Sequence, residues 1–136
     1  MGQKAVVSVE NVTTFPTEAR HNGCSKGIMH ADDQHESSVY RVKPGGFIPS
    51  HLHSRVYDLF VGIKGRVDIT YEGQQGSGRV ALSAGSFCSM PPGVRHEVRN
   101  NSADDEAIFF LVHSPNAGYD FIPVEFKSAG LTTHHS

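Results

Sequence analysis

The chain has 136 residues, enough for one domain with its own hydrophobic core and too few for a two-domain enzyme. Twelve Lys and Arg against fourteen Asp and Glu give a formal charge of −2, so the composition favours neither a nucleic acid nor an anionic membrane as a partner. The sequence contains no long apolar run, and we expect a cytoplasmic protein without a signal peptide or a membrane span. The unusual number is nine His, which is about three times the customary share.

The order of apolar and turn residues predicts an all-β fold. Residues 1–36 are expected to be an N-terminal extension with one or two short strands. From residue 37, short strand-like runs alternate with Gly and Pro turns, which is typical of a sandwich or barrel and predicts one domain over residues 37–127. The expected strands are 38–42, 56–64, 66–72, 80–82, 86–90, 94–100, 107–113 and 119–126. Residues 128–136 are expected to be a flexible tail, with a solvated His134-His135 pair near its end.

Two histidines stand close together as His51-Leu52-His53. Alternate residues of a strand project to the same face, so both imidazoles can reach one point. A chain this rich in His contains such a pair often by chance, and two surface histidines are the plain alternative. The pair therefore needs support from its surroundings.

That support comes from the spacing of the neighbouring residues. Gly45 precedes His51 by six positions, Asp58 follows His53 by five, and Gly65 follows Asp58 by seven. Further along, a second set of residues has the spacing G-x5-P-x-G-x2-H-x3-N: Gly85, Pro91, Gly93, His96 and Asn100. These residues resemble the two motifs of the cupin superfamily. The departure is Asp58, which stands where the family has Glu.

The resemblance implies a compact single-domain cupin, an all-β barrel of the double-stranded β-helix or jelly-roll type, which commonly forms a homodimer. In the family, the second motif brings its His, here His96, to the point that His51 and His53 reach. Three neutral imidazoles and one oxygen donor suit one divalent transition metal per chain (Fe, Mn, Ni, Cu, Co or Zn), with positions left open for substrate.

The fourth ligand is not fixed by the sequence. The Asp58 carboxylate reaches about 1.3 Å less far than that of Glu. Asp58 is therefore a direct metal ligand, a group that acts through water, or a solvated residue at the start of a strand. Tyr57 is the alternative at the shorter family spacing. Asn100 and the backbone of residues 91–93 are candidate hydrogen-bond acceptors for the second nitrogens of the histidines.

The candidate catalytic groups are Asp58, Tyr57 and His113. His113 is included because it shares a strand face with Phe109 and Leu111 and, if that face is interior, can act as an acid or base near the metal. Cys88 is expected to be a small buried hydrophobic residue rather than a nucleophile.

The expected interior is aromatic and poor in cations. Together with the resemblance, it predicts a metal-dependent enzyme for a small, largely apolar organic substrate, of the dioxygenase or polyketide cyclase or isomerase type. Two alternatives stay open: a non-catalytic cupin module that binds a metal or small ligand, and a cupin with a vacant site. The three histidines make the vacant site the least favoured.

Overall fold

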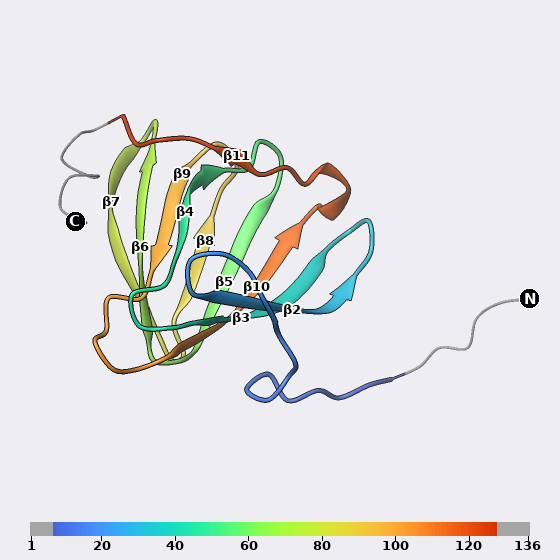
Figure 1. The fold of residues 1–136 in the computed structure, drawn as a ribbon. Coiled ribbons are helices and arrows are strands. Elements are labelled where there is room, and N and C mark those ends of the chain that lie inside the picture. The colour runs from blue at the N-terminus through green and yellow to red at the C-terminus, as the bar shows by residue number, and fades with distance from the viewer. Residues whose placement is uncertain (1–6, 128–136) are drawn as a thin grey trace, which may run out of the picture.

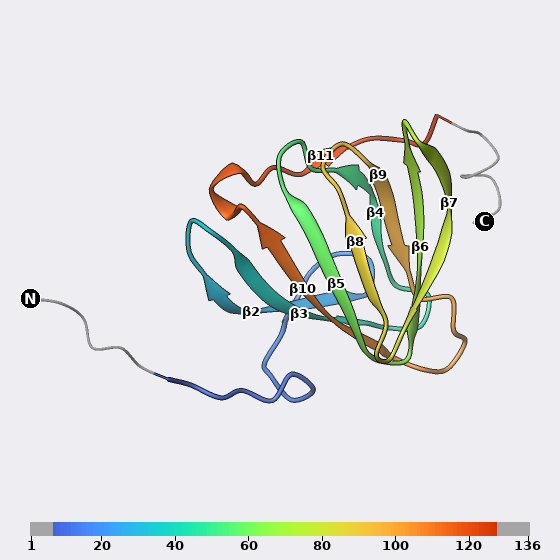
Figure 2. The ribbon, with the colours of Figure 1, turned by 180° about the vertical axis from the view of Figure 1, so that it is seen from behind.

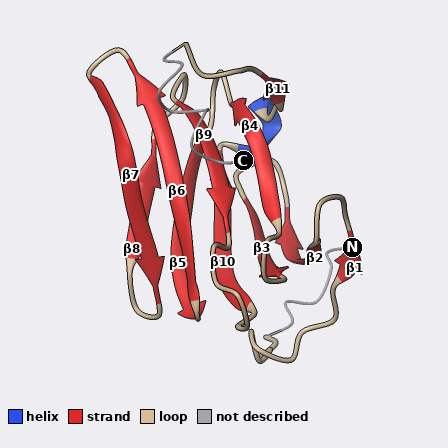
Figure 3. Cartoon of the chain, turned by 60° about the vertical axis from the view of Figure 1, so that its left-hand side comes forward, coloured by secondary structure: helices blue, strands red, loops and turns tan. Residues whose placement is uncertain are grey.

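The structure is a computed structural model that describes residues 7–127. Over this range the chain forms two antiparallel sheets that face each other, with one short helical turn (Figure 1). The strands are β1 (Glu18–Ala19), β2 (Cys24–Ala31), β3 (Glu36–Val42), β4 (Phe47–Leu52), β5 (Tyr57–Lys64), β6 (Arg66–Gly73), β7 (Gly76–Ser83), β8 (Phe87–Met90), β9 (Arg95–Arg99), β10 (Ala107–Ser114) and β11 (Ile122–Pro123). The 3-10 turn η1 (Asn116–Gly118) lies beside β11 and β4 (Figure 3).

One sheet has the strand order β1-β2-β3-β10-β5-β8, and the other has the order β11-β4-β9-β6-β7. Strands far apart in the sequence are therefore neighbours: β10 lies between β3 and β5, and β9 lies between β4 and β6. Figure 2 shows the two sheets as opposite walls of one barrel. The all-β jelly-roll architecture predicted from the sequence is confirmed.

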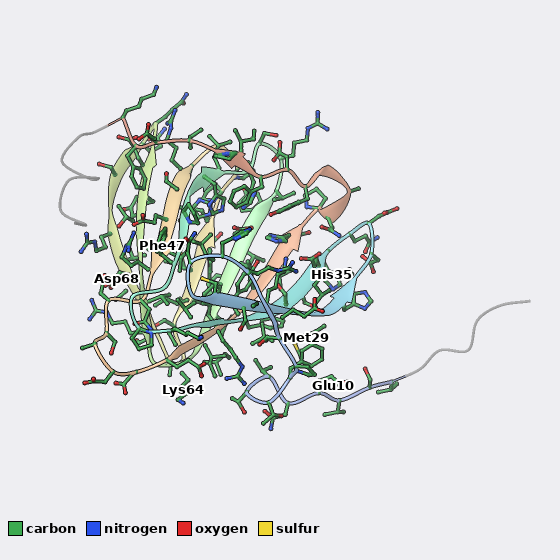
Figure 4. All side chains as sticks on the ribbon, viewed as in Figure 1. Glu10, Met29, His35, Phe47, Lys64 and Asp68 are labelled. Atoms are coloured by element: carbon green, nitrogen blue, oxygen red, sulfur yellow. The ribbon has the colours of Figure 1, made fainter. Side chains whose placement is uncertain are left out.

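The space between the sheets is apolar at one end and polar at the other. Side chains from both sheets fill it (Figure 4). Phe60, Phe109, Ile69 and Val98 are at most 1% exposed and form the centre of the hydrophobic core. In β5, the inward-facing residue next to Phe60 is Asp58. In β10, the inward-facing residue next to Leu111 is the buried His113. Along each of these two strands, neighbouring inward positions therefore hold first an apolar and then an ionisable side chain.

The strand boundaries differ from the expected ones in four places. β4 was not expected as a strand; it contains a bulge between Ile48 and His51, which accommodates Pro49. β2 is a full strand of eight residues paired with β3, so part of the N-terminal extension belongs to the barrel sheet.

The other two differences concern β7 and the C-terminal segment. β7 begins at Gly76, and the Gly-rich segment before it is reduced to a tight turn. Gly78 lies opposite Tyr71, and a Cβ there would stand 3.0 Å from the tyrosine hydroxyl, which explains a glycine inside this strand. The expected strand 119–126 is reduced to β11, and the tail 128–136 with His134-His135 lies outside the described residues.

Several motif residues have a backbone role. Gly45, Gly65, Gly85 and Gly93 adopt positive φ angles of 78°, 66°, 85° and 82°, which glycine adopts without a Cβ clash. These glycines therefore end strands and turn the chain back between the sheets.

Asn100, the last motif residue, ties two chain segments together. Its side chain is 0% exposed, and Nδ2 donates to the carbonyls of Val42 (2.9 Å) and Asp105 (2.8 Å). Its Oδ1 accepts the backbone N–H of Ser102 at 2.9 Å. Asn100 therefore bonds no histidine, which corrects the expectation that it orients one.

We predict that Asn100→Ala destabilises the fold by about 2–4 kcal/mol, because two carbonyls and one N–H lose their partner. Urea unfolding of the purified protein measures this change. The neighbouring variant Asn101→Ala removes one hydrogen bond from an exposed side chain and should cost less than about 1 kcal/mol. Equal losses in the two variants would contradict this account of Asn100.

Candidate metal centre

Four buried side chains from three strands meet at the polar end of the barrel interior. His51 lies in β4 and His53 directly after it, Asp58 is in β5, and His96 is in β9. Their exposed fractions are 4%, 3%, 2% and 1%. One ligand atom from each lies within 4.8 Å of the others. The structure therefore brings together the three predicted histidines and Asp58.

Backbone carbonyls fix the tautomer of each of the three histidines. Nδ1 of His51 donates to the carbonyl of Pro49 (2.7 Å), Nδ1 of His96 to that of Val94 (2.9 Å), and Nδ1 of His53 to that of Asp120 (2.5 Å). A carbonyl can only accept, so Nδ1 carries the proton, and Nε2 of a neutral ring presents a lone pair. All three lone pairs are thus available to a metal ion.

The distances around Asp58 fit a shared cation. Oδ2 of Asp58 lies 3.0 Å from Nε2 of His53 and 3.3 Å from Nε2 of His96. Two lone-pair donors at this distance repel each other unless a proton or a metal ion lies between them. Two ligand atoms that each stand about 2.1 Å from one ion are roughly 3.0–3.4 Å apart for angles between a right angle and a tetrahedral one. The donor set therefore fits a divalent metal ion.

The charges of the cluster are set by its burial and its neighbours. Burial lowers the pKa of His51 to about 3, which keeps this ring neutral. Burial alone would raise the pKa of the Asp58 carboxyl, but the surrounding imidazoles, with His113 first among them, hold this pKa well below its usual range. Asp58 is therefore a carboxylate. Its charge also outweighs the effect of burial on His53 and raises the pKa of that ring.

The other two candidate catalytic residues differ in position. His113 is buried, and its Nδ1 donates to Oδ1 of Asp58 at 2.6 Å. Tyr57 is next to Asp58 in β5, but its side chain is 46% exposed and projects to the opposite face of the strand. The structure does not bring Tyr57 to the cluster.

A C-terminal segment covers the cluster, and sequence reasoning missed it. The Phe121 ring stacks on His51 at 4.1 Å between centroids, and the Tyr119 ring packs against His113 at 4.5 Å. Between them, Asp120 accepts hydrogen bonds from the backbone N–H (2.8 Å) and the hydroxyl of Ser54. Tyr119 and Phe121 have no motif spacing to the ligands, so their aromatic character is the only sequence signal that could have drawn attention to them.

A cleft of about 910 Å³ lies between the β6–β7 hairpin and the segment 88–94, and its lining includes none of the four cluster residues themselves. Tyr71 pairs with His96 across the sheet, and Met90 pairs with Asp58, so the cleft wall contains the strand neighbours of two ligands. Among the residues that the structure describes, no charged side chain lines this cleft.

A second cleft, of about 500 Å³, lies beside β2, β3 and β4 and is bordered by Phe121. Arg20 and Lys26 line it, but neither is buried, and no Lys or Arg is among the buried residues of the part of the chain that the structure describes. Lys26 is paired with Glu36 at 2.8 Å.

One further group of metal-type ligands lies on the β2–β3 hairpin and consists of His30, Asp32 and His35. Its members are exposed or half-buried, and Asp32 already accepts the backbone N–H groups of Gln34 and His35. Hydrogen bonding within the hairpin accounts for this group.

Over residues 7–127 the chain has no helix long and apolar enough to cross a membrane.

A two-sheet jelly roll is the architecture of double-stranded β-helix domains, and here its inner face carries three histidines and one carboxylate that could hold a metal ion. The Cupin domain family model matches residues 38–113, which is more than half of the chain. The chain belongs to the cupin family.

Individual relatives are more distant. The chain is 30% identical over 93 residues to Germin-like protein 5-1 of Oryza sativa subsp. japonica; the match covers 66% of this chain and 40% of that protein. A Klebsiella pneumoniae protein with a double-stranded β-helix domain has a TM-score of 0.74 and 20% identity, over 93% of this chain and 100% of its own. KdgF from Halomonas sp. has a TM-score of 0.67 and 15% identity, and the match covers 81% of this chain and 94% of that protein. These two structures support the fold alone.

We predict that the purified protein binds one divalent transition metal ion per chain and that His51→Ala or His96→Ala removes most of it. Each substitution deletes one of four ligand atoms. Elemental analysis after dialysis measures the ratio. His21→Ala is the matched control, since His21 is exposed and outside the cluster, and it should bind as the native chain does. Equal metal contents in all four proteins would contradict the site.

Proposed function

We propose that the chain is a metal-dependent cupin enzyme that acts on a small, largely uncharged organic molecule, by dioxygenase or by polyketide cyclase or isomerase chemistry. The observation that carries this proposal is the buried set of three histidines and Asp58, two of which pair with Tyr71 and Met90 of neighbouring strands in the wall of a cleft without charged side chains. Such a cleft favours apolar ligands with a few polar atoms. The cytoplasmic location and the homodimer expected from the sequence stay predictions.

In this proposal, different residues hold the ion, position the substrate and donate a hydrogen bond to it. The three Nε2 atoms and Oδ2 of Asp58 would hold the ion, which when bound supplies a Lewis acid for a carbonyl or enolate oxygen. Val94 and Met90 provide apolar walls that position the substrate. Tyr71 lines the same cleft, and its hydroxyl can donate a hydrogen bond to a substrate oxygen.

Tyr119 and Phe121 keep water away from the histidines. Their rings lie on the imidazoles of His113 and His51, and each leaves part of its own surface exposed. Excluding water strengthens every electrostatic interaction at the ion.

The experiment supplies the protein in turn with Fe²⁺, Mn²⁺, Ni²⁺ and Zn²⁺ and adds a panel of uncharged diketones and phenols. Oxygen uptake with a new product indicates a dioxygenase, and a new product without oxygen uptake indicates a cyclase or isomerase. If, with every metal, the native chain forms no more product than His96→Ala does, the enzyme proposal is overturned and a binding module is left.

A cleft variant separates substrate binding from metal binding. We predict that Val80→Trp, which places a large ring in the cleft, leaves the metal content unchanged and lowers kcat/KM at least about tenfold. Val80 is 39% exposed, so the barrel tolerates the larger side chain. Steady-state kinetics with the best substrate of the panel measure the effect, and unchanged kinetics would place the substrate elsewhere.

A further inference from the structure

We propose that His113 is a positioning residue that holds Asp58 in place as a metal ligand through one oxygen. The inference rests on the proposed metal site. It concerns the position where this chain has Asp and the family motif has Glu.

The two oxygens of Asp58 face different partners. Oδ2 faces Nε2 of His53 and of His96, whereas Oδ1 accepts the proton on Nδ1 of His113 at 2.6 Å. A carboxylate bound in this way offers one oxygen to the ion, because the other is already engaged. The ion is then held by three nitrogens and one oxygen, and more coordination positions stay open for a substrate.

The backbone sets up this contact. β5 and β10 pair with His113 directly opposite Asp58, so both side chains project from neighbouring strands into the interior. A shorter carboxylate than Glu has less reach and depends more on a partner that fixes its direction. His113 supplies that partner from the adjacent strand.

The His113 ring has no other hydrogen bond among the described residues. Its Nε2 is buried without a hydrogen-bond partner. The nearest carboxylate oxygen is that of Glu36 at 3.8 Å, and Lys26 already engages it. Tyr119 packs against the ring and restrains its orientation. Among the described residues, the only hydrogen bond of this buried imidazole is therefore the one to Asp58.

Affinity for Zn²⁺, measured on the full chain by competition with a chromophoric chelator, tests the role. We expect His113→Leu to weaken binding about 10–100-fold, the usual effect of removing a group that orients a ligand. His113→Asn keeps a donor two bonds from Cβ, as Nδ1 is, and should restore most of the affinity. Thermal unfolding of the metal-free proteins checks that each variant folds.

A double-mutant cycle separates positioning from a general structural effect. In an Asp58→Ala background, His113→Leu should change the affinity by less than about twofold, because the carboxylate that it holds is gone. With Co²⁺ as the probe, the visible spectrum of His113→Leu should shift toward that of Asp58→Ala. Equal losses in both backgrounds, or no loss in either, would overturn the inference.

The outcomes also distinguish this inference from the proposed function. If the cycle shows the coupling but no substrate is turned over, the enzyme proposal fails and the role of His113 stands. If turnover depends on the metal but His113→Leu binds as the native chain does, the role of His113 fails and the enzyme stands. If the native chain binds neither Zn²⁺ nor Co²⁺, the role of His113 fails, and the enzyme proposal is decided by turnover with Fe²⁺, Mn²⁺ or Ni²⁺.

Discussion

A single buried carboxylate is the constraint on which the site depends. Asp58 is 2% exposed and ionised, and an uncompensated charge at such a position costs several kcal/mol. Three imidazoles lie within 3.3 Å of its oxygens, so the charge is compensated from two sides. A divalent ion held between Oδ2 and the Nε2 atoms would complete that compensation. The fold thus places in the interior a charge that a metal ion would balance.

The pairing of the strands makes this arrangement possible. β10 lies between β3 and β5, so His113 lies opposite Asp58 on one side and Glu36 on the other. The facing sheet pairs His51 with His96 through a bulged β4. Residues far apart in the sequence thus meet at one level of the barrel. The apolar core directly below keeps that level rigid.

The cluster has an aromatic cover on one side and a cleft on another. On one side, Tyr119 and Phe121 cover the imidazoles, and Asp120 bonds both the ring of His53 and the loop after β4. On another side, the cleft wall at Tyr71 and Met90 borders two of the ligands. The aromatic cover and the cleft therefore lie on different sides of the cluster, as the proposed enzyme requires for excluding water and admitting a substrate.

The sequence by itself determined the all-β fold, the three histidines and the family, because strand periodicity and motif spacing are local properties. The motif glycines adopt positive φ angles, so the turns of the fold require glycine at these fixed positions and the motif can be recognised from its spacing. The position of Asp58 among the histidines, the partners of Asn100 and the cover from Tyr119 depended on strands and loops far apart in the chain. Only the tertiary structure decided these, since which strands become neighbours, and which oxygen of a carboxylate faces which nitrogen, is set by sheet order and register.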